Sequence, residues 1–383
     1  MDYIKRNIEE TIIKLNKKYP VIIITGARQV GKTTLLNFIK QKDKINYVTL
    51  DDIKVRTLAL ENPQQFLKQY EAPLIIDEFQ YAPSLLKYIT TTNKQFYLIQ
   101  NDDKIIDKEV GILNLYGLSN REINGYQANL FIPSKKNLKI ESSSLEALYK
   151  RILKGSFPIL YNTNIDKNTF YDNYIKTYIE RDIRELINIK DEIKFMKFIS
   201  AVAFKTGQEL IINDICKEVD ITNPTALTWL SILFNTGIIY LLQPLSNKVG
   251  RIIKRPKIYF MDTGLACYLM GYTNSKAIEN NTFILETYVV SEIIKSFSNN
   301  GLKADEHLFY YRDNNNHKID LLIIYHNTVY PIKISKSFNM DFINNFKFVN
   351  NFKMKVGSGA IICIADKMFQ IDKNNYCIPI EYI

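Results

Sequence analysis

The chain has 383 residues, of which 46% are hydrophobic, and a formal net charge of +10. This composition predicts two or three globular domains, and no apolar run approaches the ~18–20 residues that a membrane helix needs. Residues 1–10 lack the apolar core of a secretory signal. The four cysteines are widely spaced, which argues against a zinc site or a disulfide framework and favours the cytoplasm. The basic charge permits a nucleic-acid partner without requiring one.

The N-terminal region predicts a helix, a strand and a glycine-rich loop in succession. Isoleucine and leucine recur at helical spacing through residues 3–18, and Pro20 ends that helix. Residues 21–24 form a β-branched run that is typical of a buried strand. Residues 26–33 match the phosphate-binding pattern GxxxxGK followed by Ser or Thr, and the apolar spacing from Thr34 onward predicts a helix.

This strand, loop and helix together indicate an anion site. The glycines allow backbone N–H groups to point at a phosphate, and the helix dipole favours negative charge there. We expect Lys32 to reach the β- and γ-phosphates of ATP and the Thr33 hydroxyl to ligate Mg²⁺. The residues expected to bind the nucleotide are Gly26, Ala27, Arg28, Gln29, Val30, Gly31, Lys32, Thr33 and Thr34.

A second part of the same site follows an apolar run. The predicted strand at 74–76 ends in Asp77 and Glu78, which is the Walker B pattern. Asp77 is expected to hold Mg²⁺ or its water shell, and Glu78 to polarise the attacking water. Further strands are predicted at 45–50, 96–99 and 112–115. Strands that alternate with helices indicate a parallel α/β sheet.

Asn101 is a candidate sensor of the γ-phosphate. It follows the predicted strand at 96–99, where P-loop ATPases of the AAA class carry a polar side chain for this purpose. Asparagine at the end of a strand is also ordinary turn chemistry. Both interpretations of Asn101 stay open at this point.

Helical patterns dominate the middle of the chain. A polar stretch between residues 134 and 144 predicts a linker, and 145–233 is mostly helical in pattern. Helices predicted at 211–219 and 224–233, with Thr222 or Asn223 as the cap of the second, have helix-turn-helix spacing. Strands predicted at 238–242 and 258–260 flank a basic segment, as two strands flank the wing of a winged helix.

The basic segment is a candidate contact to the phosphates of DNA or RNA. It carries Lys248, Arg251, Lys254 and Arg255 and no acidic residue. The second helix of the pair has no Lys or Arg, and winged helices also bind proteins. Contact with nucleic acid, a protein partner and a purely structural role all stay open.

The C-terminal region is similar to the restriction-endonuclease core, in which Glu, Asp and a second acid precede a lysine. A helix predicted at 283–298 carries Glu286, and the strands that follow carry Asp320. Lys333 occupies the position of the second acid, and Ser335 that of the lysine. Because a cation repels a metal ion from its site, we predict an endonuclease-like fold without nuclease activity.

Several separated segments resemble one protein family. They are residues 25–36, 75–83, 152–158, 178–186 and 259–265. They resemble the prokaryotic AAA-type ATPases whose C-terminal half is the domain of unknown function 4143, and the last three of them resemble parts of that domain. The resemblance covers nearly the whole chain, and it implies ATP and Mg²⁺ as cofactors.

The chain departs from that family at two places. Ile99-Gln100-Asn101 stands where the family usually has Thr-Gly-Ser, and Asp107-Lys108-Glu109 where it has Ala-Gly-Arg. The absent arginine removes a stabiliser of transition-state charge, which contributes ~10³-fold or more where an arginine finger operates. Arg181 and Arg184 could substitute from the same or a neighbouring subunit, although their spacing also fits ion pairs on a helix surface.

We therefore predict an α/β P-loop NTPase domain with a parallel sheet over 1–141, a helical winged-helix region over 142–262 and an α/β endonuclease-like domain over 263–383. The predicted function is ATP binding with slow hydrolysis, coupled to a C-terminal half that binds nucleic acid or a protein. A non-hydrolysing, nucleotide-gated regulatory module is the alternative, and an Mg²⁺-dependent nuclease is the weaker one. We expect a cytoplasmic protein without a membrane partner, and an oligomer is compatible with the sequence.

Overall fold

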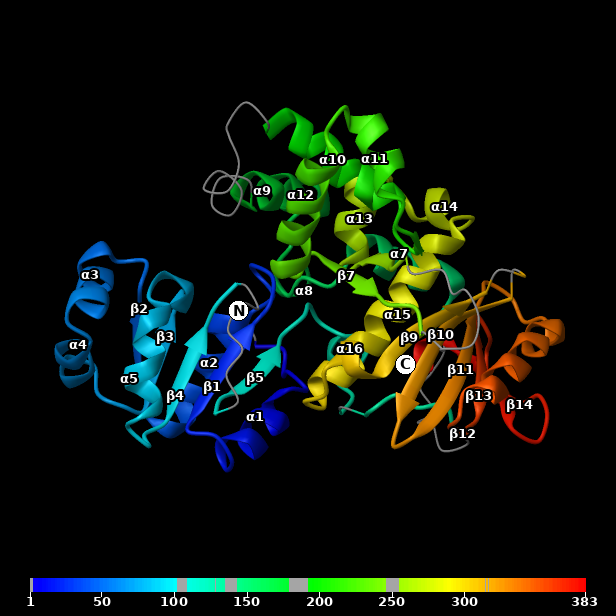
Figure 1. Cartoon of the computed structure of the whole chain (residues 1–383). Coiled ribbons are helices and arrows are strands. Elements are labelled where there is room, and N and C mark those ends of the chain that lie inside the picture. The colour runs from blue at the N-terminus through cyan, green and yellow to red at the C-terminus, as the bar shows by residue number, and fades with distance from the viewer. Residues whose placement is uncertain are drawn as a thin grey trace.

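The structure, a computed structural model of the chain, describes residues 3–101, 109–127, 129–134, 143–178, 192–245, 255–313, 315 and 317–383. It contains a parallel sheet flanked by helices, a helical middle region and a C-terminal mixed sheet (Figure 1). These three parts have the architecture that the sequence predicts. Among the described residues, no helix has both the length and the apolar character needed to cross a membrane.

The N-terminal sheet has the strand order β2-β3-β4-β1-β5, and its neighbouring strands are parallel. The strands are β1 (Val21–Thr25), β2 (Asn46–Thr49), β3 (Leu74–Asp77), β4 (Phe96–Ile99) and β5 (Gly111–Asn114). Strands β1, β3 and β4 are buried throughout, which explains their continuous apolar sequences. Parallel strands end at a common edge, so the segments after β1, β3 and β4 lie close together.

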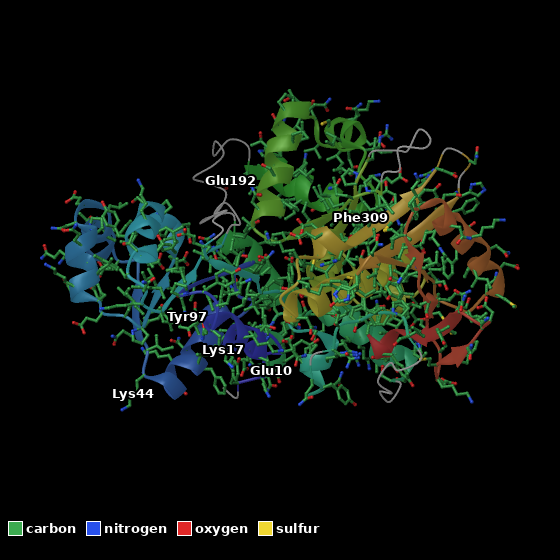
Figure 2. The ribbon with its side chains drawn as sticks, turned by 60° about the horizontal axis from the view of Figure 1, so that its bottom comes forward. Glu10, Lys17, Lys44, Tyr97, Glu192 and Phe309 are labelled. Atoms are coloured by element: carbon green, nitrogen blue, oxygen red, sulfur yellow. The ribbon has the colours of Figure 1, made fainter. Side chains whose placement is uncertain are left out.

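Helices cover both faces of this sheet. They are α1 (Glu9–Asn16), α2 (Lys32–Asp43), α3 (Ile53–Glu61), α4 (Pro63–Gln69), α5 (Leu86–Thr90) and α6 (Asn120–Ile123), with 3-10 turns η1 (Phe79–Tyr81) and η2 (Pro83–Leu85). Alternate β1 residues enter two apolar clusters, Ile22 on one face and Ile23 on the other. Tyr97 on β4 lies inside this region and accepts a hydrogen bond from Asn16, whereas Lys44 lies at its exposed edge (Figure 2).

The middle region packs helices around a small antiparallel sheet. The helices are α7 (Leu145–Lys154), α8 (Ile159–Asn162), α9 (Lys167–Tyr178), α10 (Glu192–Phe204), α11 (Ile212–Val219), α12 (Asn223–Asn235), α13 (Thr263–Leu269) and α14 (Ser275–Ile278). The sheet order is β6-β8-β7, with β6 (Gln208–Glu209), β7 (Ile239–Leu242) and β8 (Lys257–Phe260). Trp229 of α12 meets Phe195 and Phe198 of α10 edge-on at 5.4 Å between ring centroids. Thr222 caps α12, as one of the two predicted alternatives.

The C-terminal region is a mixed sheet backed by a long buried helix, α15 (Thr282–Asn299). The sheet order is β14-β15-β13-β11-β10-β9, and β12 pairs with β11 outside this order. Strand β10 is antiparallel to both of its neighbours, β9 and β11. Strands β11, β13 and β15 run parallel to one another. The other elements are α16 (Ala304–His307), β9 (Leu308–Arg312), β10 (Lys318–Tyr325), β11 (Thr328–Ile334), η5 (Met340–Asn351), β12 (Lys355–Val356), β13 (Gly359–Cys363), β14 (Phe369–Gln370), β15 (Asn375–Pro379) and η6 (Ile380–Tyr382).

Buried polar contacts join the first region to the last. The Asn120 backbone N–H donates to Glu292 Oε2 of α15 at 2.7 Å, and Lys295 Nζ donates to the Leu118 carbonyl at 3.0 Å. Arg121 Nη2 donates to the Tyr382 carbonyl at 2.9 Å. Since these groups are buried, helix α6 is fixed against the C-terminal region by polar contacts that water does not replace.

Candidate nucleotide-binding site

The glycine-rich loop between β1 and α2 adopts a backbone that only glycine tolerates at two positions. Gly26 has φ 137°, and a Cβ added there would lie 2.1 Å from the Leu115 carbonyl oxygen of the neighbouring β5 edge. Gly31 has φ 96° and precedes the first residue of α2. These positive φ values let the loop turn tightly and open the helix N-terminus toward the sheet edge.

Lys32 lies inside this loop and is only 6% exposed. Its Nζ donates to the Gly26 carbonyl at 2.6 Å and to the Ala27 carbonyl at 2.8 Å. It also donates to Asn101 Oδ1 at 2.9 Å. Asn101 therefore contacts the loop lysine, because β4 lies beside β1 in the sheet.

Asp77 ends β3 and meets the Thr33 hydroxyl. Thr33 Oγ1 donates to Asp77 Oδ2 at 2.9 Å, and the Tyr47 hydroxyl donates to the same oxygen at 2.9 Å. The other oxygen, Oδ1, accepts the Glu78 backbone N–H at 2.9 Å. A hydroxyl and a carboxylate side by side fit Mg²⁺, which takes oxygen ligands and is usually held by one or two carboxylates together with waters and phosphates.

Tyr47 is a member of this site that the sequence did not reveal. It comes from β2, which pairs in parallel with β3, and its hydroxyl reaches across to Asp77. Burial and the Asp77 charge raise the pKa of Tyr47 well above its usual value, so the hydroxyl stays a donor. The alternating pattern of β2 predicted a strand and gave no sign of this contact.

Glu78 follows Asp77 in a left-handed conformation, with φ 55°. Its Oε2 accepts from Asn101 Nδ2 at 3.1 Å and from Gln80 Nε2. Its Oε1 lies 3.4 Å from Nη1 of Arg28, the third residue of the loop. Positive φ at a residue other than glycine marks a conformation that the surroundings enforce, which is common at functional sites.

Arg6 stabilises the phosphate loop through hydrogen bonds, and no sequence motif predicted this role. It is 3% exposed, and its guanidinium donates to the Val30 carbonyl at 2.8 Å and to the Tyr116 carbonyl at 2.7 Å. Its Nε pairs with Glu122 Oε1 of α6 at 3.1 Å. Arg6 thus connects the phosphate loop to the helix that contacts the C-terminal region.

The arginine substitutes proposed from the sequence fall outside the described residues. These substitutes are Arg181 and Arg184. Asp107 and Lys108, at the family's Ala-Gly positions, also lie outside the described residues. Glu109, at the position of the family arginine, is described and lies exposed just before β5.

In the C-terminal region, both endonuclease-like acids pair with lysines. Lys333 Nζ lies 2.7 Å from Asp320 Oδ2, and Lys257 Nζ lies 2.8 Å from Glu286 Oε1. The Tyr259 hydroxyl also donates to Glu286 Oε1 at 2.7 Å. Lys333 thus occupies the predicted position beside Asp320, whereas Ser335 Oγ donates to the Ser337 carbonyl, at 2.7 Å.

The charges of these two pairs stabilise one another. Burial opposes ionisation of Asp320, but Lys257 and Lys333 hold the pKa of its carboxyl below the usual value. Burial likewise opposes the charge on Lys257, yet Glu286 and Asp320 raise the pKa of its ammonium group. Two acids and two lysines therefore form one charge-balanced cluster, and among the described residues no group of three metal-ligating side chains was found.

The basic segment proposed as a wing is described only at its end. Lys248, Arg251 and Lys254 lie outside the described residues. Arg255 is exposed, and its carbonyl accepts a hydrogen bond from the Tyr310 hydroxyl of β9.

Comparison with protein families places three domains along the chain. An AAA domain matches residues 18–123, and the domain of unknown function 4143 matches 281–383. The chain thus combines an AAA domain with a C-terminal domain 4143. A further domain of unknown function, 8612, matches 145–276. The segments at 152–158, 178–186 and 259–265, taken above as part of domain 4143, fall within that middle match.

Proteins similar to this chain occur in bacteria and archaea. Uncharacterized proteins of Mycobacterium bovis and Mycobacterium tuberculosis are each 24% identical over 376 residues, which is 95% of this chain and 81% of the relative. An uncharacterized protein of Methanocaldococcus jannaschii is 23% identical over 307 residues, covering 68% of this chain and 64% of its own length.

Two solved structures align with parts of this chain. A Walker-type ATPase of Pyrococcus abyssi has a TM-score of 0.42 at 14% identity and covers 70% of this chain and 96% of its own. A signal transduction ATPase with numerous domains and a tetratricopeptide repeat sensor, from Pyrococcus horikoshii, has a TM-score of 0.26 at 14% identity, covering 76% of this chain and 46% of its own.

Proposed function

We propose that the AAA domain binds ATP with Mg²⁺ and hydrolyses it slowly to ADP and phosphate. The observation that supports this most directly is the meeting of Lys32, Asp77 and Glu78 at one sheet edge. Asn101 bonds to both Lys32 and Glu78, so one amide spans the space between the phosphate-binding cation and the water-polarising acid. Such positioning, together with charge stabilisation, is most of what phosphoryl transfer requires of a protein.

The proposed roles follow from chemistry and position. The N–H groups of the loop and Lys32 bind the phosphates, and the Thr33 hydroxyl and Asp77 would hold Mg²⁺. An ion held by these two residues would supply positive charge that stabilises the phosphate oxygens during transfer. Glu78 accepts a proton from water, whose oxygen bonds to the γ-phosphorus. The bond from that phosphorus to the bridging oxygen breaks, and ADP leaves with the bonding electrons.

A single-turnover ATPase assay on the wild type and on Glu78→Gln tests hydrolysis. We expect the variant to bind ATP at least as tightly as the wild type but to hydrolyse it ~10²-fold or more slowly, since general-base contributions are of that size. Retained hydrolysis in Glu78→Gln would assign the base to another residue. Turnover of the isolated wild type at tens per second would contradict slow hydrolysis.

A non-hydrolysing nucleotide-gated module is the second candidate. It is favoured by Glu109 in the place of the family arginine and by the donors that already engage both oxygens of Glu78. In this case the wild type and Glu78→Gln would be equally inert in the assay yet bind ATP tightly.

The middle region is proposed to bind the partner. Helices α10 to α12 with the β6-β8-β7 sheet follow the order of elements in a winged helix. On α12, Leu227 is 51% and Phe234 is 42% exposed, which favours a protein partner over base reading by that helix. Nucleic-acid contact then depends on Lys248, Arg251, Lys254 and Arg255. If charge reversal of these four residues left nucleic-acid retention unchanged, that part of the proposal would be wrong.

The domain limits and the cytoplasmic location are also proposals. We propose a first domain over 1–141, a middle region over 142–262 and a C-terminal domain over 263–383. Helices α13 and α14 pack against α7 of the middle region, which supports a later second boundary, nearer to residue 280. The cytoplasm is supported by the four free cysteines, all of them buried.

A further inference from the structure

Arg28 connects the phosphate loop directly to Glu78. Its Nη1 lies 3.4 Å from Glu78 Oε1, and the two side chains are 12% and 16% exposed. Since neither side chain is largely in water, solvent screens this pair less than it screens a surface ion pair. Glu78 Oε2 is engaged from the other side by Asn101 and Gln80.

This pairing restrains the role proposed for Glu78. A carboxylate that polarises water must offer an oxygen to that water, at hydrogen-bond distance. A guanidinium close to Oε1 occupies that oxygen, so the oxygen is not offered to a water molecule. With this pair in place, donors occupy both carboxylate oxygens of Glu78.

The γ-phosphate of ATP would compete for the same guanidinium. Lys32 and Glu78 both contact the Asn101 amide, so a phosphate held by Lys32 lies beside Glu78 and within reach of Arg28. A terminal phosphate carries more negative charge than a carboxylate and presents three oxygens. Arginine binds such groups through two parallel N–H donors, which favours exchange from Glu78 to the phosphate.

We propose that Arg28 senses the γ-phosphate: it leaves Glu78 when ATP binds and returns to Glu78 when ADP remains. The exchange frees Glu78 for water only while ATP is present. It also brings to the γ-phosphate a cation from the same chain, at a site where Glu109 replaces the family arginine. This inference rests on the proposed ATP site and identifies the residue that distinguishes ATP from ADP.

The test is the ratio of affinities for a non-hydrolysable ATP analogue and for ADP, measured with Mg²⁺ by calorimetry. We expect Arg28→Gln to weaken binding of the analogue ~10-fold, as the loss of one charge-assisted contact would, while ADP affinity changes less than about 2-fold. Unchanged ADP affinity also shows that the variant is folded. Arg28→Lys keeps the charge without the planar donors, so its affinity for the analogue should lie between those of the wild type and Arg28→Gln.

A matched control is Arg56→Gln in the same domain. The Arg56 guanidinium lies 3.8 Å from the centroid of the Tyr81 ring, and its Nε donates to the Leu50 carbonyl at 2.8 Å. Neither contact involves the phosphate loop or Glu78. The ratio of affinities should therefore equal that of the wild type in this variant.

The double variant distinguishes exchange from simple charge removal. Glu78→Gln releases Arg28 and should strengthen analogue binding several-fold, and that gain should disappear in Arg28→Gln/Glu78→Gln. A gain that persists there, or equal loss of ATP-analogue and ADP affinity in Arg28→Gln, would overturn the inference while leaving the ATP site intact. Failure of the wild type to bind either nucleotide would instead reject the proposed function, and the inference with it.

Discussion

Two clusters in this molecule contain aspartate, glutamate and lysine side chains, but the contacts of these side chains differ between the two. In the AAA domain, Asp77 accepts from the neutral hydroxyls of Thr33 and Tyr47, and Lys32 donates to backbone carbonyls and an amide. In the C-terminal region, Asp320 and Glu286 pair directly with lysines. Neutral donors leave the charge of Asp77 available to a cation, whereas the ion pairs satisfy Asp320 and Glu286 internally. Residue type alone therefore does not define a metal or nucleotide site.

Breaking the C-terminal pair should have the largest effect on stability. Lys333→Ala leaves the Asp320 carboxylate buried without its closest cation, and removal of one member of a buried pair costs several kcal/mol. We expect a loss of about 3 kcal/mol, at the low end of that range because Lys257 still acts on Asp320. Hydrogen exchange of peptides from β10 and β11 measures the local free energy of opening.

The matched control replaces both members of the pair. Asp320→Asn/Lys333→Met keeps the volumes and removes both charges, so it should regain most of the lost stability. A loss in Lys333→Ala below about 0.5 kcal/mol would show that the pair is no stronger than a surface ion pair. Metal-dependent cleavage of nucleic acid by the wild type, abolished in Asp320→Ala, would contradict the predicted absence of nuclease activity.

In the AAA domain, the corresponding change should affect binding and not folding. Lys32→Ala removes a cation that donates to the neutral Gly26 and Ala27 carbonyls, so we expect it to cost less stability than Lys333→Ala, which breaks a buried ion pair. We expect ATP affinity to fall ~10²-fold, about 2.7 kcal/mol, through loss of contacts to the phosphates. Calorimetric titration measures this, with the exposed Lys87→Ala on α5 as the control. Thermal unfolding of Lys32→Ala should stay within a few degrees of the wild type.

The phosphate loop and the acids after β3 could be predicted from the sequence because each signal lies within one short segment. The pattern at 26–33 and the acids after β3 each sit at the end of one apolar strand, and parallel pairing brings those ends together. Tyr47 and Arg6 carry no such signal. Tyr47 reaches Asp77 from a neighbouring strand, and Arg6 contacts groups 24 to 116 positions away.

The two ion pairs of the C-terminal region differ in how far the sequence predicted them. Its alignment slot predicted a cation near Asp320, and the structure has that ion pair. The second pair was not predicted, because Lys257 lies on β8 of the middle region and Glu286 on α15. A motif-based alignment compares positions within one domain, so a partner that another region supplies escapes it.

Substitution of Arg6 should have a smaller effect on ATP affinity. This residue contacts both the phosphate loop and helix α6, which packs against the C-terminal region. In Arg6→Gln the Val30 carbonyl loses its donor, so the loop is less well ordered for phosphate, and we expect ATP affinity to fall ~10-fold. The control Arg151→Gln breaks another buried pair, with Glu381 at 2.7 Å, and should lower stability without lowering ATP affinity. Equal effects of the two variants on ATP affinity would make the role of Arg6 merely structural.

The smallest effect we predict is a pH dependence confined to the C-terminal cluster. The folded pKa of Asp320 is lowered, so its stabilisation is present above the unfolded pKa of ~3.9 and is lost as pH falls through the folded value. The folded pKa of Lys257 is raised, so its stabilisation is present below ~10.4 and is lost as pH rises through the folded value. Hydrogen exchange of β10 peptides, corrected for intrinsic rates, should therefore show a stability plateau between these limits. In Asp320→Asn the acid limb should flatten, and an unchanged acid limb would show that other carboxyls control it.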